Sequence, residues 1–79
     1  MKGEDLLLPD LGLDGPIALS LWLVKKGGRV VEGEPIAEVV GGEATVDLPS
    51  PADGVLAERL VEEGDPLAVG QRLAVIEIC

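Results

Sequence analysis

The chain has 79 residues, a net charge of −9 at pH 7 and a single aromatic residue, Trp22. Its length suits one small domain, stabilised by a dense core of leucine, valine, isoleucine and alanine. The negative charge disfavours contact with nucleic-acid phosphates and with anionic membrane lipids. The sequence therefore predicts a single globular domain over residues 1–79 that has neither nucleic acid nor membrane as a partner.

The sequence also bears on the cellular compartment. No apolar run approaches the roughly 18 residues of a membrane-spanning helix, and the first residues lack the apolar region of a signal peptide. The single cysteine, Cys79, cannot form an internal disulfide, which fits a reducing compartment. We therefore expect a cytoplasmic protein. The absence of asparagine and histidine favours a thermophilic source.

Side chains suited to catalysis are scarce. Without histidine, the groups available for acid–base chemistry or metal binding are carboxylates and Cys79, which has no basic neighbour to activate its thiol. The glycine pairs at 27–28 and 41–42 open no predicted helix, so they do not match a dinucleotide-binding fingerprint. We predict no catalytic residue and no metal site, and we interpret the acidic side chains as solvated surface groups.

The sequence contains an internal repeat. Residues 10–39 aligned with residues 47–76, an offset of 37, give eight identical pairs in thirty. Chance would give roughly two or three at typical residue frequencies. Two copies are too few for a solenoid, which needs three or more. We therefore predict one domain whose two halves are related by quasi-twofold symmetry.

Each copy of the repeat predicts β-structure. The segment IALSLWLV at 17–24, matched by GVLAERLV at 54–61, alternates with the period of a half-buried strand. The predicted inward positions are Ile17, Leu19, Leu21, Leu23, Leu56 and Leu60. Trp22 and Arg59 fall on the outer face, where we interpret Trp22 as a partly covered rim residue. Glu58 takes the place of Leu21 and indicates a bulge or an edge position.

Glycines recur at equivalent turns of the two copies. Gly27 corresponds to Gly64 and Gly33 to Gly70, and all four are expected to adopt a positive φ. Short strands separated by such turns, without helical periodicity, predict an all-β sandwich or flattened barrel.

Four segments span about Leu8 to Glu77: LPDLG, IALSLWLVKKGGRVVEGEPIAEV, ATVDLPSPADGVLAERLVEEGD and VGQRLAVIE. Together they resemble the lipoyl domain of the acyltransferase component (E2) of 2-oxo acid dehydrogenase complexes. The resemblance implies a barrel-sandwich hybrid of two small antiparallel sheets with quasi-twofold symmetry, in agreement with the repeat. Biotinyl domains share this fold, but methionines flank their lysine, whereas Ala44 and Thr45 follow the lipoyl style.

The resemblance also locates a cofactor position that this chain has altered. Lipoyl domains carry an acidic–Thr–Asp–Lys–Ala run whose lysine forms an amide with lipoic acid. The aligned residues here are Val40, Gly41, Gly42, Glu43 and Ala44. A carboxylate cannot form that amide, so Glu43 is not an attachment site and we predict no bound cofactor.

The chain has three lysines elsewhere. Lys2 lies at the terminus, and Lys25 and Lys26 lie at the first glycine turn. The repeat matches Lys25 and Lys26 with Glu62 and Glu63, so neither copies the hairpin position of the family lysine. We interpret all three as solvated surface charges.

Two registers are open for the hairpin around residues 40–44. If Gly42 and Glu43 are the central residues, as in the family pattern, Glu38 faces Asp47. If Gly41 and Gly42 form a primed turn, Glu38 faces Thr45 and a like-charge cross-strand pair is avoided. Both registers place one set of residues inward: Ala37, Val39, Ala44, Val46 and Leu48.

These observations predict a lipoyl-like domain without a lipoyl group. It would be a structural or interaction module, not an enzyme by itself, associated with components of a 2-oxo acid dehydrogenase E2-type assembly. One alternative is the carrier-domain portion of a dihydrolipoamide acyltransferase subunit whose chemistry lies on other domains, which predicts a flexible linker after residue 79. A second alternative is a cofactor-free adaptor module on the same fold. Such adaptors carry an insertion at the tip, which this sequence lacks.

Overall fold

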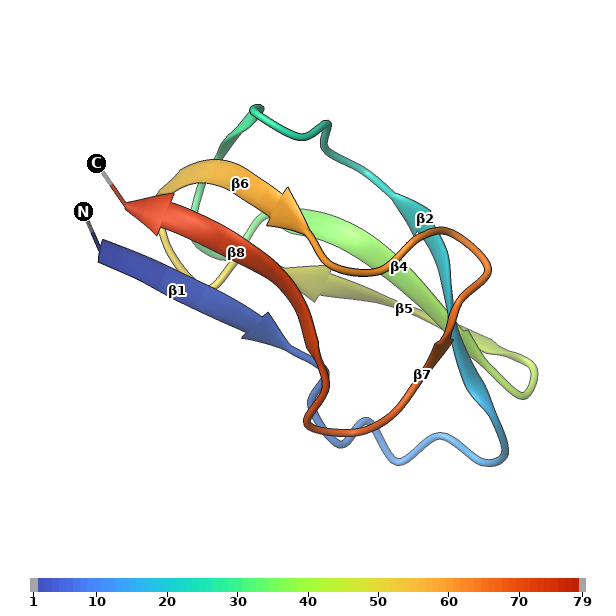
Figure 1. Ribbon diagram of the computed structural model, residues 1–79. Coiled ribbons are helices and arrows are strands. Elements are labelled where there is room, and N and C mark those ends of the chain that lie inside the picture. Colours follow the sequence, from blue (N-terminus) through green and yellow to red (C-terminus); the bar gives the residue numbers. More distant parts are fainter. Residues whose placement is uncertain (1, 79) are drawn as a thin grey trace.

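The computed structural model describes residues 2–78, within which every regular element is a β-strand. The strands are β1 (Lys2–Leu7), β2 (Ile17–Trp22), β3 (Arg29–Val30), β4 (Pro35–Gly41), β5 (Ala44–Pro49), β6 (Gly54–Arg59), β7 (Pro66–Leu67) and β8 (Arg72–Ile78). Sheet I has the strand order β1-β8-β6-β3 and sheet II the order β5-β4-β2-β7, with antiparallel pairing throughout (Figure 1). The predicted all-β fold of two small antiparallel sheets is confirmed.

The two sheets are built alike. Adding 37 to the bounds of β2, β3 and β4 gives the bounds of β6, β7 and β8. The pairing of β2 with β4 is repeated by β6 with β8, including a register shift at the same place. Strands β5 and β1 then occupy corresponding sheet edges. Each position in one sheet therefore has a counterpart in the other.

The glycine turns follow the same relation. Gly27 N–H donates to the Leu56 carbonyl at 2.7 Å, and Gly64 N–H donates to the Leu19 carbonyl at 2.8 Å. The φ angles of Gly27 and Gly64 are 86° and 94°. The second predicted pair of turn glycines, at 33 and 70, has φ angles of 88° and 86°. The predicted positive φ is confirmed at all four glycines.

The core lies between the two sheets and consists of aliphatic side chains. It comprises Leu6, Leu8, Leu19, Val30, Ile36, Ala37, Val39, Leu48, Leu56, Val61, Leu67, Leu73, Ala74 and Ile76. Leu19 and Leu56 are 1% and 0% exposed, as predicted from their equivalent positions. Within the hairpin, the predicted inward face holds for Ala37, Val39 and Leu48, while Val46 is partly buried. Ala44 is exposed because it lies beside the turn.

The predicted inward positions of Leu23 and Leu60 are wrong, because these side chains are 45% and 46% exposed. In β2 the register shifts between Leu19 and Leu21, so that Leu21 pairs with Glu38 of β4 and its predicted inward position is wrong as well. In β6 the corresponding shift lies between Leu56 and Glu58. One extra residue in a strand moves every later side chain to the other face.

The shift also changes the position of Trp22. It pairs with the buried Ala37 and packs against the core, rather than lying on the outer face. Val61, one residue beyond Leu60, is buried. The bulge predicted at Glu58 is confirmed, and it is the reason that Leu60 turns outward.

The two ends of the molecule differ. Lys2 of β1 pairs with Ile78 of β8 at one end, and the turn between β4 and β5 projects at the other (Figure 1). The start of β1 and the end of β8 therefore lie opposite the turn that contains Gly42. Within residues 2–78 there is no helix long and apolar enough to cross a membrane.

Alanine substitutions at the four leucines should separate into two classes. Leu19→Ala and Leu56→Ala should each lower the free energy of unfolding by about 2–5 kcal/mol, because each leaves a cavity in the core. Leu23→Ala and Leu60→Ala should each cost less than about 1 kcal/mol, because the side chains are half in solvent. Urea unfolding of the four variants measures this difference, and equal losses at all four positions would contradict the bulged strands.

Candidate functional site

The candidate site is the β4–β5 hairpin tip, residues 40–44. Gly41 pairs with Ala44, so Gly42 and Glu43 are the two central residues of the turn. Val39 faces Val46 and Glu38 faces Asp47. Of the two registers open from the sequence, the structure has the one of the family pattern. The like-charge cross-strand pair that the other register would avoid is therefore present.

The backbone of the turn requires glycine at residue 42. Its φ is +60°, whereas Glu43 has a negative φ, as does every other non-glycine residue in the described part of the chain. A two-residue hairpin with positive φ at the first central position is typical of a type II′ turn. A side chain at residue 42 would be strained by that φ, and its Cβ would lie 3.3 Å from the Asp14 carbonyl oxygen.

Gly41 is needed for a different reason. It is buried and continues the inward-facing series of Ala37 and Val39. A Cβ at residue 41 would lie 2.9 Å from Leu13 Cδ1 and 3.0 Å from Leu13 Cβ. The loop that precedes β2 therefore packs its leucine against the hairpin where a side chain would otherwise stand. The tip and the loop at 9–16 form one packed unit.

Glu43 is exposed at the second central position of the turn, and Ala44 beside it is exposed as well. The three lysines lie elsewhere. Lys2 begins β1, and Lys25 and Lys26 are exposed between β2 and β3. Lys26 Nζ lies 3.7 Å from the Glu58 carboxylate, an ion pair between exposed side chains. The turn thus presents a carboxylate, and no lysine stands in it.

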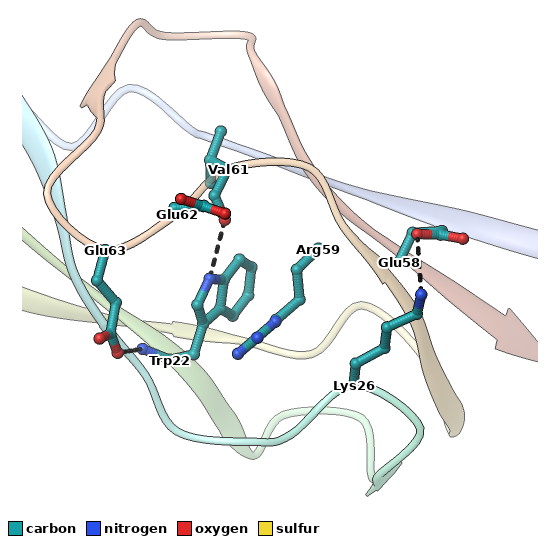
Figure 2. Close-up of a pocket in the computed structure, with 7 residues that line it drawn as sticks. All are labelled: Trp22, Lys26, Glu58, Arg59, Val61, Glu62 and Glu63. Carbon is teal, nitrogen blue, oxygen red and sulfur yellow. Dashed lines mark hydrogen bonds and ion pairs between the residues drawn. The ribbon is translucent and has the colours of Figure 1, made fainter.

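A second feature is an open hollow of about 460 Å³ around Trp22, shown in Figure 2. The indole N–H donates to the Val61 carbonyl at 3.0 Å, and the Trp22 backbone N–H donates to the Glu63 carboxylate at 2.9 Å. The Arg59 guanidinium lies 5.8 Å from the ring centroid, within cation–π distance. These contacts join β2 to the segment after β6. Trp22 is a partly covered residue, as predicted, and its ring is already engaged by the chain itself.

No group of three or more histidine, cysteine, aspartate or glutamate side chains within residues 2–78 is arranged to hold a metal ion. The contact between Leu13 and Gly41 was not predicted from the sequence. The sequence does show an apolar residue, Leu13, in a loop between Gly12 and Gly15. That pattern suggests a buried contact, but it does not show that the contact is with Gly41, 28 residues away.

The fold and its exposed hairpin are those of a biotin/lipoyl domain. The chain matches the family described as "Biotin-requiring enzyme" over residues 4–76, and it belongs to that family. This confirms the family expected from the sequence.

Relatives of the chain include acyltransferase components of 2-oxo acid dehydrogenase complexes. The chain is 38% identical over 80 residues to the lipoamide acyltransferase component of the branched-chain alpha-keto acid dehydrogenase complex of Bacillus subtilis, covering 98% of this chain and 18% of that protein. It is 37% identical over 73 residues to the dihydrolipoyllysine-residue acetyltransferase component of the pyruvate dehydrogenase complex of Staphylococcus aureus, covering 89% and 16%. The chain spans less than a fifth of the length of these relatives.

The packing of Leu13 on Gly41 can be tested by adding a single methyl group. Gly41→Ala should destabilise the fold by about 1–3 kcal/mol, because the new Cβ overpacks the contact with Leu13. Gly3→Ala is the matched control, since its Cβ would meet Val75 at an ordinary 3.4 Å. It should be neutral or slightly stabilising.

Denaturant unfolding in two backgrounds measures the coupling. In a Leu13→Ala background the cost of Gly41→Ala should fall in part, because the contact with Leu13 Cδ1 is gone while the contact with the Cβ of residue 13 stays. An unchanged cost in that background would contradict the contact between Leu13 Cδ1 and the tip.

Proposed function

We propose that this chain is a lipoyl-like domain that carries no lipoyl group and acts as a structural or interaction module in an E2-type acyltransferase assembly. By itself it is not an enzyme. The observation that carries the proposal is the identity of the exposed turn residue Glu43, at the position that corresponds to the family's attachment lysine. The E2 relatives support a place in such an assembly. That place is a proposal for this chain, because the chain spans a small part of each relative.

The chemistry of lipoylation supports a domain without a lipoyl group. Lipoylation joins activated lipoate to a nucleophilic amine, and Glu43 offers a carboxylate that accepts no acyl group in this way. The turn differs from the family run at other positions too. Threonine at residue 41 would meet Leu13, and aspartate at residue 42 would have to adopt a φ of +60°. The tip is therefore packed around the two glycines, and a change of one residue does not restore the family run.

The two alternative functions that the sequence left open have different structural requirements. A carrier portion of an acyltransferase subunit needs an amine that can be acylated, and the exposed lysines Lys25 and Lys26 lie outside the hairpin turn. An adaptor module on this fold is favoured by an insertion at the tip, and the turn between β4 and β5 has only the two central residues Gly42 and Glu43. The proposed interaction role needs no insertion and places no group on Glu43.

Treatment of the purified chain with lipoate, ATP and a lipoate ligase tests the proposal directly. The intact mass should stay unchanged. The matching segment of the Staphylococcus aureus relative, whose name records a dihydrolipoyllysine residue, serves as the positive control. A gain of one lipoyl group, mapped by peptide analysis to Lys2, Lys25 or Lys26, would overturn the non-carrier proposal.

Two variants extend the test to the shape of the tip. Glu43→Lys alone should be modified poorly or not at all, because the flanking residues still differ from the family run. A fourfold variant, Val40→Glu, Gly41→Thr, Gly42→Asp and Glu43→Lys, should be modified more completely if it folds, and circular dichroism checks folding. Glu43→Gln, which adds no amine, is the blank. Full modification of Glu43→Lys alone would show that the flanking residues do not matter to the ligase.

A further inference from the structure

The outer face of sheet II carries a short row of uncharged side chains. Thr45 of β5 faces Val40 of β4, Val40 faces Ala18 of β2, and Ala18 faces Pro66 of β7. Because Val39 and Leu19 are buried, alternation along the strands turns Val40 and Ala18 outward. The row crosses all four strands, and within residues 2–78 no other segment pairs beyond its two ends.

Carboxylates flank this row. Asp47 and Glu38 face each other directly across β5 and β4, two residues from Thr45 and Val40. Like charges directly opposite each other in a sheet are destabilising. The face therefore combines an uncharged row with an anionic edge formed by Glu38 and Asp47.

The charges of the chain are divided unequally between the two sheets. Each strand of sheet I contains one basic residue, and these four are balanced by four carboxylates. The strands of sheet II contain Glu38 and Asp47 and no lysine or arginine. Sheet II thus keeps its negative charge without a counterion of its own, whereas the charges of sheet I sum to zero.

Because the two sheets are built alike, each residue of sheet II can be compared with its counterpart in sheet I. Asp5 is the counterpart of Asp47, and it pairs with Arg72 at 3.1 Å. The counterparts of Thr45, Val40, Ala18 and Pro66 are Gly3, Glu77, Val55 and Arg29, a row that contains its own opposite charges. The same backbone therefore carries a self-neutralised face on one side and an unneutralised one on the other.

We propose that the outer face of sheet II is a docking surface for a cationic segment of a partner protein, one that presents apolar side chains between lysines or arginines. The apolar side chains would cover the row from Thr45 to Pro66, and the basic groups would neutralise Asp47 and Glu38. Charge complementarity selects this occupant over an anionic surface such as nucleic acid or acidic lipid. The proposal goes beyond the absence of a cofactor and does not depend on what stands at residue 43.

A heteronuclear NMR titration of the isotopically labelled 79-residue chain tests the surface. The probe is a short amphipathic peptide of leucine and lysine, and the comparison peptides replace leucine by serine or lysine by glutamate. The leucine–lysine peptide should shift the amide signals of Ala18, Val40 and Thr45 more than those of their counterparts Val55, Glu77 and Gly3. The serine–lysine peptide should bind at least about fivefold more weakly, since it lacks apolar contacts, and the leucine–glutamate peptide should not bind.

Charge variants at matched positions separate docking from general attraction. Asp47→Asn and Asp5→Asn remove the same charge from equivalent places in the two sheets. Asp47→Asn should weaken binding of the leucine–lysine peptide about two- to fivefold, the range expected of one exposed ion pair. Asp5→Asn should change it less than about twofold. Thermal unfolding confirms that both variants are folded.

Two results would overturn the proposal. Equal weakening by Asp47→Asn and Asp5→Asn, or shifts of equal size on both sheets, would mean that the net charge alone attracts the peptide. Failure of the leucine–lysine peptide to bind even at low ionic strength, where screening is weak, would mean that the face is not a docking surface. Neither result alters the lipoylation assay, so this proposal and the proposed function can fail independently.

Discussion

The single extra residue in each of β2 and β6 determines which side chains form the core. Up to the bulge, Leu19 and Leu56 point between the sheets; after it, Trp22 and Val61 do. Without the bulge the strict alternation would put Leu23 inward and Val24 outward. The bulge instead turns Leu23 to solvent and lets Val24 pack against the core. Because the irregularity occurs in both halves, the two sheets close on one another with the same geometry.

Much of the fold follows from local patterns. The offset of 37, the turn glycines and the alternating strands are properties of near neighbours or of identical residues, which a sequence displays directly. Glu58 also signalled a bulge, because a charged side chain broke an inward series. Alternation alone could not show that Leu60 points to solvent. The face of a residue depends on where along the strand the extra residue lies, because only the residues beyond the bulge change faces.

The hairpin tip shows why a favourable local rule failed to choose between registers. Two adjacent glycines suggest one primed turn, which would also separate Glu38 from Asp47. The structure uses the glycines for two unrelated purposes: Gly42 provides the positive φ, and Gly41 leaves room for Leu13. The second requirement comes from a contact with a residue far away in the sequence. The packing of Leu13 on Gly41 favours the register in which Glu38 faces Asp47, despite the repulsion between these two carboxylates. A surface repulsion of this kind costs a few tenths of a kcal/mol to about 1 kcal/mol, less than overpacking or an unfilled cavity.

The tip and the outer face of sheet II place different demands on the chain. Carrying an acyl group depends on one amine at one turn position, so a single substitution is enough to abolish it. A docking face depends on side chains from four strands, whose outward direction is set by the same pairing that buries Val39 and Leu19. Substitutions at sites that share no contacts have nearly additive effects, and Glu43 takes no part in the cross-strand row from Thr45 to Pro66. A substitution at the turn position can therefore leave intact a surface that the strand pairing holds in place, including the facing carboxylates of Glu38 and Asp47.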